Sequence, residues 1–198
     1  MGDHARRAVF LDRDGTIVDD PPPGFLHEPD KVRLLPGAGE AIRRLNDAGW
    51  SVVVVSNQGG IARGLFDASA YAAVQRRLAE LLAEHGARLD GEYFCPHHPE
   101  FTGPCQCRKP GVKLFRDAEA ALGLNLRRSY WVGDRVSDLS PANTLGGRGL
   151  LVETGHGAMQ VGKARALGFT VVPDLAAAAA AILRASPAPP PPPPTSSP

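Results

Sequence analysis

Two aspartates one residue apart, Asp12 and Asp14, are the residues whose types and spacing most clearly indicate chemistry. They directly follow the apolar run 8–11, which has the composition of a buried parallel strand. A plain Asp-Gly turn with an aspartate cap is one interpretation. Open α/β sheets, however, bind ligands at the carboxyl ends of their strands, so both carboxylates should point into that crevice. Repulsion and lost hydration there call for a cation, a proton or a phosphate-handling role.

Two further polar clusters suit a phosphate group. Ser56 and Asn57 follow the nearly all-apolar run 50–55 and lead into a glycine pair. A hydroxyl and the backbone N–H groups of such a turn can donate to a phosphate oxygen, although a plain turn is the alternative. Lys109 lies just before a predicted helix, where its compact charge would neutralise a phosphate or an aspartate. Alone, it would be read as part of a solvated basic pair.

A second pair of aspartates follows the run 130–132. Asp134 and Asp138 add carboxylates at the end of a third predicted strand. Asp138 could instead be only a favourable charge at a helix N-terminus. The two residues extend the acidic character of the same sheet edge.

The elements that must position these side chains alternate between strand and helix. Such alternation predicts an α/β fold with a doubly wound, mostly parallel sheet. The predicted strands are 8–11, 50–55, 92–94, 130–132, 150–152 and 169–172. The predicted helices are 39–48, a helix capped by Asp67 or Ser69 that runs to about Glu84, 114–122 and an alanine-rich helix capped by Asp174.

All three cysteines of the chain lie in the 13-residue stretch 95–107, which also holds two histidines and several loop-forming prolines and glycines. Three thiolates and one imidazole complete a closed tetrahedral site, so a bound Zn²⁺ would be structural. A disulfide with a spare thiol, or three free thiols, are the alternatives. The awkward geometry of a Cys-x-Cys bridge and a cytoplasmic setting count against the disulfide. The candidate ligands are Cys95, Cys105, Cys107 and either His97 or His98.

Composition bounds the class of protein. The 198 residues are 43% hydrophobic, which suits one soluble domain with a sizeable core. A net charge of +1, from 22 basic and 21 acidic residues, offers no basic stripe for nucleic acid. No apolar run reaches the roughly 18 residues of a membrane span, and segment 1–7 is too short and polar for a signal peptide. We expect a cytoplasmic monomer with no nucleic-acid or membrane partner.

The composition changes abruptly near the C-terminus. We expect one domain over 1–185 and a disordered, polyproline II tail over 186–198, which contains six consecutive prolines. The tail is either dispensable or a weak interaction segment for proline-binding modules.

Strand-end Asp-x-Asp, strand-end Ser, pre-helical Lys and strand-end Gly-Asp-x-x-x-Asp occur here in the order that is typical of the haloacid dehalogenase (HAD) phosphohydrolases, and region 9–152 resembles that superfamily. The resemblance implies that Asp12 attacks phosphorus and forms an aspartyl-phosphate. Asp14 would protonate the leaving alcohol and then activate water. It also implies Mg²⁺ on the Asp12 carboxylate, the Asp14 backbone carbonyl and Asp134, with Asp138 as an auxiliary ligand.

The resemblance gives the remaining polar residues their roles. A carboxylate attacks a phosphate dianion only if positive charge and hydrogen-bond donors offset the repulsion. Mg²⁺, Lys109, Ser56 and Asn57 would supply that offset, which makes Ser56 and Lys109 catalytic as well as substrate-binding.

The cysteine-rich loop and Cys107-Arg108-Lys109-Pro110 resemble one HAD branch, the D-glycero-D-manno-heptose 1,7-bisphosphate and histidinol-phosphate phosphatases. This branch lacks a large cap domain, and its Cys-x-His spacing favours His97 over His98 as the fourth zinc ligand. Arg108 would contact substrate, and Arg63 would grip a distal anionic group. Phe25 lies where the branch has tyrosine.

These observations predict a Mg²⁺-dependent, zinc-stabilised phosphomonoesterase for a small phosphorylated sugar. The expected substrate is the 7-phosphate of D-glycero-D-manno-heptose 1,7-bisphosphate. Histidinol phosphate is the enzymatic alternative, as is phosphoryl transfer to an acceptor other than water. A non-catalytic phospho-ligand sensor on the same fold is the alternative from another class.

Overall fold

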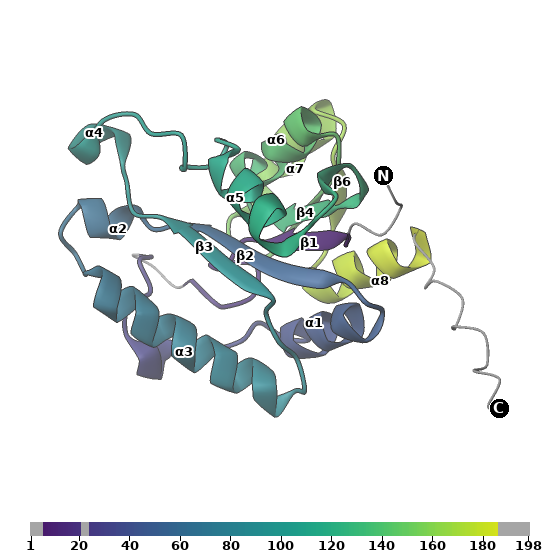
Figure 1. Ribbon diagram of the computed structural model, residues 1–198, viewed down its shortest axis with the longest axis horizontal. Helices are drawn as coiled ribbons and strands as arrows, with labels where there is room; N and C mark the ends of the chain where they lie inside the picture. The colour runs from purple at the N-terminus through teal and green to yellow at the C-terminus, as the bar shows by residue number, and fades with distance from the viewer. Residues whose placement is uncertain (1–5, 21–23, 186–198) are drawn as a thin grey trace, which may run out of the picture.

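A single parallel sheet forms the centre of the molecule in the computed structural model, which describes residues 6–20 and 24–185 (Figure 1). The strand order is β3-β2-β1-β4-β5-β6, and every neighbouring pair is parallel. The predicted α/β fold with a doubly wound sheet is thereby confirmed. The strands are β1 (Ala8–Leu11), β2 (Ser51–Asn57), β3 (Gly91–Cys95), β4 (Tyr130–Gly133), β5 (Arg148–Val152) and β6 (Thr170–Val172).

Helices cover both faces of the sheet, so the inner strands are buried on each side. Side chains alternate along β1, with Val9 and Leu11 in one core and Ala8 and Phe10 in the other. The first core is closed by α1 (Ala38–Asp47), α3 (Ala68–Glu84) and α8 (Leu175–Ala185), and the second by α5 (Lys113–Leu122), α6 (Val136–Leu145) and α7 (Val161–Ala166). No large cap domain interrupts the described ranges.

The longest helix, α3, forms as its sequence predicts. The Asp67 carboxylate accepts a hydrogen bond from the backbone N–H of Ala70 at 2.8 Å and so caps the first turn. Tyr71, Val74 and Leu78 follow at helical spacing and are buried against the sheet. The inner side of this helix also carries Gln75, whose Oε1 accepts from Arg13 Nη1 at 3.3 Å in the loop that follows β1.

Several short elements were not predicted. These are α2 (Gly59–Ala62), α4 (Pro99–Thr102), α7 and the 3₁₀ turns η1 (Pro29–Lys31), η2 (Leu126–Arg128) and η3 (Gly157–Gln160). A single turn is too short to show a periodic apolar pattern. The longer α6 was also not predicted, because its sequence contains Pro141, a residue that disfavours a helix interior, and its buried residues do not form a narrow stripe.

Residues 21–23 and the predicted tail 186–198 lie outside the described residues, so the division into a domain and a tail stays a prediction. Within the described ranges, none of the helices has the length and apolar character needed to cross a bilayer.

Candidate active site

The carboxyl ends of β1, β2 and β4 meet at one sheet edge, because these three strands are neighbours. Asp12 follows β1, and its backbone N–H donates to Val132 O at 2.9 Å, which continues the ladder by one residue. Ser56 lies at the end of β2, and Asp134 directly follows β4. A cleft of about 510 Å³ opens above this edge. The predicted residues that line it are Asp12, Asp14, Ser56, Asn57, Arg63, Arg108, Lys109 and Asp138.

Lys109 is a buried cation beside the first aspartate. Its Nζ lies 2.7 Å from Asp12 Oδ1 and 2.9 Å from Asp138 Oδ1, and it donates to Val55 O at 2.6 Å. These contacts use all three ammonium protons. Burial lowers the pKa of Lys109, but the attraction of the two carboxylates outweighs it and raises the pKa above its ordinary value. Lys109 is therefore a fixed positive charge at the Asp12 carboxylate.

Asn57 holds the Lys109 segment in place. Its side-chain Oδ1 accepts from the Lys109 backbone N–H at 2.9 Å, and its Nδ2 donates to Lys109 O at 3.2 Å. Both ends of the amide are thus committed to the backbone of the lysine. The phosphate-binding role predicted for Asn57 stays a prediction, and its observed contacts are those of a residue that positions Lys109.

Three carboxylates gather where a divalent cation would bind. Asp12, Asp134 and Asp138 each present an oxygen within 4.8 Å of the others. Asp134 Oδ2 accepts from the His156 backbone N–H at 2.7 Å, whereas its buried Oδ1 has no hydrogen-bond partner in the described part of the chain. A buried acceptor without a partner is costly unless a ligand fills the place. Carboxylate oxygens are the ligands that Mg²⁺ prefers, so the donor set fits this ion.

Asp138 differs from the other two carboxylates. Its Oδ1 faces Lys109, and its Oδ2 accepts from the Arg135 backbone N–H at 2.9 Å. The second bond lies at the start of α6, where Asp138 reaches back to cap the helix. With both oxygens engaged, Asp138 is better placed to hold Lys109 than to ligate a cation directly.

The Asp-Gly step of the first motif is required by close packing. Gly15 has φ +77°, and a Cβ atom there would lie 2.5 Å from Asp134 Oδ2. No side chain fits at that distance, so only glycine lets the β1 loop approach Asp134. The motif thus brings the carboxylates of two strands together.

The burial of the acidic cluster changes its titration. Burial raises the pKa of Asp12 to about 8; Lys109 opposes this rise, while Asp138 and Asp134 add to it. Burial, followed by repulsion from Asp138, raises the pKa of Asp134 to about 6. Additional positive charge at this edge of the sheet would therefore favour the ionised form of both groups.

The raised pKa values predict how stability depends on pH. Between about pH 4 and 8 the folded-state carboxyls of Asp12 and Asp134 retain protons that they release in the unfolded chain, so the stability that these two groups contribute falls as pH rises. In protein purified without added Mg²⁺, the thermal midpoint is expected to decrease across this window. The Asp12→Asn variant, which cannot ionise there, should show a flatter decrease. Differential scanning fluorimetry across the pH series tests this, and equal slopes in both proteins would contradict it.

Asp14 lies in a hydrogen-bond network with Arg13 and Gln58, two residues that were not predicted to belong to the site. Arg13 Nε donates to Asp14 Oδ1 at 2.8 Å, and Arg13 Nη2 donates to Oδ2 at 2.9 Å. Gln58 Nε2 donates to Asp14 Oδ2 at 2.8 Å and to Ser56 Oγ at 2.7 Å. An arginine between two aspartates after a buried strand was the available signal for Arg13. Gln58 offered only its place in the predicted turn.

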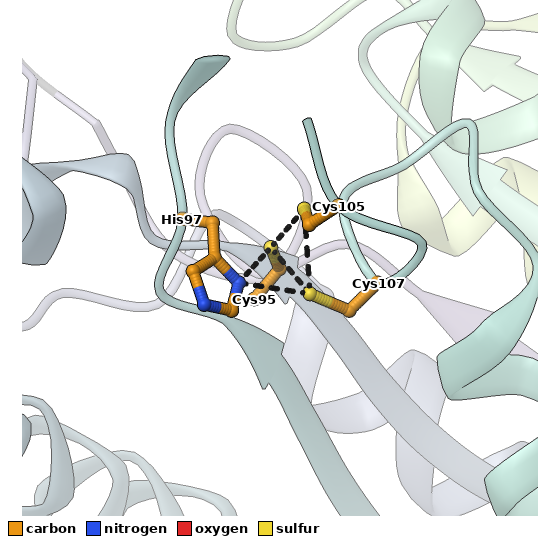
Figure 2. A group of neighbouring side chains, drawn as sticks. All are labelled: Cys95, His97, Cys105 and Cys107. Atoms are coloured by element: carbon orange, nitrogen blue, oxygen red, sulfur yellow. Dashed lines mark hydrogen bonds between the residues drawn. The ribbon is translucent and has the colours of Figure 1, made fainter. Parts of the chain in front are cut away.

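The cysteine-rich loop forms a compact cluster (Figure 2). The sulfur atoms of Cys95, Cys105 and Cys107 lie 3.0 to 3.6 Å apart, and His97 Nδ1 lies 3.2 Å from Cys107 Sγ. These separations are far longer than the roughly 2.05 Å of a disulfide bond. They approach the roughly 3.8 Å set by tetrahedral Zn–S bonds of about 2.3 Å. The three cysteines are therefore free thiols in this structure, and the donor set fits a closed zinc site.

The two histidines of this loop face different partners. His97 points into the sulfur cluster, whereas His98 Nε2 lies 3.1 Å from Arg63 Nη2. Arg63 lies between two aromatic rings, with its guanidinium 5.7 Å from the Phe25 ring centroid and 5.1 Å from that of Phe101. The cysteine-rich loop thus holds the arginine that was predicted to grip a distal anion.

Arg108 is also oriented by the cysteine-rich loop. Its Nη1 donates to His97 O at 3.0 Å. Arg63 and Arg108 consequently present two positive charges to the same cleft as Asp12.

Comparison with known proteins gives consistent matches. The HAD-hydrolase-like family model matches residues 106–178. The D-glycero-beta-D-manno-heptose-1,7-bisphosphate 7-phosphatase of Pseudomonas aeruginosa is 38% identical over 173 residues, which span 87% of this chain and 96% of the relative. The phosphatase of the same name from Yersinia pestis is 39% identical over 80% of this chain and 87% of its own length.

Solved structures agree with these matches. The D,D-heptose 1,7-bisphosphate phosphatase of B. bronchiseptica, crystallised with magnesium and phosphate, is 36% identical with a TM-score of 0.83, and the match covers 91% of this chain and 99% of that one. The D,D-heptose 1,7-bisphosphate phosphatase of Burkholderia thailandensis is 33% identical with a TM-score of 0.67, over 90% and 99% of the two chains.

Proposed function

Because this chain belongs to the HAD-like family of D-glycero-beta-D-manno-heptose-1,7-bisphosphate 7-phosphatases, we propose that it hydrolyses the 7-phosphate of that sugar bisphosphate. The chain is a phosphoric monoester hydrolase, which decides against the non-catalytic sensor. The observation that supports a bisphosphate is the pair of guanidiniums, Arg63 and Arg108, in the cleft that contains Asp12. One phosphate reacts at Asp12, and these two side chains meet the other.

In the first step an oxygen of Asp12 attacks phosphorus. The bond from Asp12 to phosphorus forms as the bond from phosphorus to the sugar oxygen breaks, giving an aspartyl-phosphate. Asp14 transfers its proton to the departing sugar oxygen, which therefore leaves as an alcohol. Lys109, 2.7 Å from Asp12, and the Ser56 hydroxyl offset the negative charge of the transferring group.

In the second step water cleaves the aspartyl-phosphate. Asp14, now ionised, accepts a proton from water as the water oxygen attacks phosphorus. The bond between Asp12 and phosphorus breaks, inorganic phosphate leaves, and Asp12 and protonated Asp14 are restored. Gln58, which contacts Asp14 and Ser56, keeps the acid–base group beside the phosphate site.

The oxygens of Asp12 and Asp134, with the backbone carbonyl of Asp14, would hold Mg²⁺ in this cleft. When bound, the ion neutralises charge on the phosphate and on the buried carboxylates. Asp138 acts on the reaction through Lys109. Zn²⁺ on Cys95, His97, Cys105 and Cys107 is proposed as a structural ion.

A phosphate-release panel tests the substrate. With Mg²⁺, the purified protein is expected to show its highest kcat/KM on D-glycero-β-D-manno-heptose 1,7-bisphosphate, because only a bisphosphate uses the two guanidiniums as well as Asp12. Histidinol phosphate and sugar monophosphates should be at least about tenfold poorer, the effect of losing about 1.4 kcal/mol of binding. Equal or better kcat/KM on histidinol phosphate would overturn the assignment. Adding alcohols tests for acceptors other than water.

The cytoplasmic location and the monomeric state predicted from the sequence remain predictions, as does the role of the tail.

A further inference from the structure

A line of hydrogen bonds connects the surface of the sheet to the acid–base group Asp14. The exposed Glu92, on edge strand β3, accepts from Gln75 Nε2 at 2.9 Å. Gln75 lies on the inner side of α3, and its Oε1 accepts from Arg13 Nη1 at 3.3 Å. Arg13 then grips both oxygens of Asp14. Glu92, Gln75 and Arg13 therefore form a chain of hydrogen bonds that ends at the carboxylate of Asp14.

Arg13 is a fully buried charge with an unusually complete set of partners. Its relative exposure is 0%. Besides Asp14 and Gln75, Nη2 donates to Leu26 O at 3.2 Å, so four of its five N–H groups are engaged. The guanidinium carbon lies 5.3 Å from the ring centroid of Tyr71, which is also buried. A buried arginine bound on this many sides has one available orientation.

Gln75 is the partner of Arg13 on the side of the guanidinium opposite Asp14. Of the side chains and carbonyls in the described ranges, Gln75 Oε1 is the acceptor that meets Arg13 Nη1. The Nε and Nη2 edge of the same planar group holds Asp14. Because the guanidinium is rigid and planar, an acceptor at Nη1 fixes the direction in which the opposite edge points. Gln75 itself is buried, with 4% exposure, and Glu92 holds its other end.

We propose that Gln75 is a positioning residue for Asp14 and acts through Arg13. The inference rests on the proposed function in one respect, that Asp14 is the proton carrier. Gln75 does not touch the reacting atoms. Its contribution is to fix the orientation of the Arg13 guanidinium and, through it, that of the Asp14 carboxylate, which would otherwise be free to rotate.

A loosened Asp14 should affect some substrates more than others. A sugar alkoxide is a poor leaving group and needs its proton during bond cleavage, whereas an aryl oxide such as 4-nitrophenolate leaves without one. The value of kcat/KM reports the step in which the leaving group departs. Loss of orientation should therefore lower kcat/KM for sugar phosphates and largely spare aryl phosphates.

A double-mutant cycle tests the inference. Gln75→Met keeps the size of the side chain but removes the acceptor for Arg13, and it is expected to lower kcat/KM for the sugar bisphosphate about tenfold. In an Asp14→Asn background the same change should have less than about a twofold effect, because there is no proton carrier left to orient. For 4-nitrophenyl phosphate the Gln75→Met change should also be less than about twofold.

Val74→Ala is the matched control. Val74 is the buried neighbour of Gln75 on α3 and packs in the core, so its truncation destabilises the same helix without touching Arg13. Its kcat/KM values should fall equally, if at all, on both classes of phosphate. Equal losses in the wild-type and Asp14→Asn backgrounds would overturn the role of Gln75. Retained activity in Asp14→Asn alone would instead overturn the proton-carrier role of Asp14.

Discussion

Replacement of Asp12 by asparagine is expected to lower kcat by at least about 10⁴-fold, to the limit of detection. The amide cannot form the aspartyl-phosphate, so the covalent route through Asp12 is lost rather than slowed. Phosphate release from the sugar bisphosphate, measured with saturating Mg²⁺, gives this number.

The fold of the Asp12→Asn variant should remain intact. Asparagine is nearly the same size, and Lys109 keeps its contacts with Asp138 and with Val55 O. Circular dichroism and the thermal midpoint check this. Asp19→Asn provides a matched control, since Asp19 is an exposed aspartate that does not line the cleft, and its kcat should stay within about twofold of wild type. Activity of Asp12→Asn within about a hundredfold of wild type would mean that another group attacks phosphorus.

Loss of the zinc site is the second large effect that the structure predicts. Freshly purified protein is expected to contain one zinc ion per chain, and His97→Gln should lose it. Metal binding at such a site stabilises the fold directly, so losing it should lower the thermal midpoint by about 10 °C or more. The kcat/KM should fall as well, because His97 O orients Arg108. Metal analysis, thermal melts and the phosphate-release assay measure these three results.

His98→Gln separates zinc binding from substrate binding. His98 faces Arg63 rather than the sulfur cluster, so this variant should keep its zinc and its thermal midpoint while KM rises. If His98→Gln lost zinc and His97→Gln retained it, the assignment of the fourth ligand would be reversed. No zinc in the freshly purified wild type would refute the site altogether.

Whether a site residue could be predicted from the sequence depends on where it lies in the fold. Asp12, Ser56 and Asp134 end three buried strands, and strands of this kind are visible as short apolar runs. Since the carboxyl ends of neighbouring parallel strands meet, their convergence at one cleft was predictable without coordinates. The sulfur cluster was equally predictable, because all its candidate ligands lie within one short stretch of sequence.

Other contacts depend on the path of the chain in space. Gln75 lies 62 positions from Arg13, on a helix whose apolar face alone was predicted. A glutamine on such a face gives no sign of the partner it will meet across the sheet. Asn57 was predicted to bind phosphate because of the residues beside it in the sequence. In the structure its amide binds the backbone of Lys109, a residue that only the folded chain brings next to it.

The cysteine-rich loop has a consequence for how such an enzyme diversifies. Its ends are tied together by four side chains around one point, and Cys95 anchors that point to the end of β3. Segment 98–104 lies between the residues of this cluster and contacts Arg63. Asp12 and Lys109 lie outside this segment. We expect insertions and deletions in this segment to leave Asp12 and Lys109 in place. The segment is therefore where a lineage, or a designer grafting new sequences, can exchange one leaving group for another on an unchanged phosphatase.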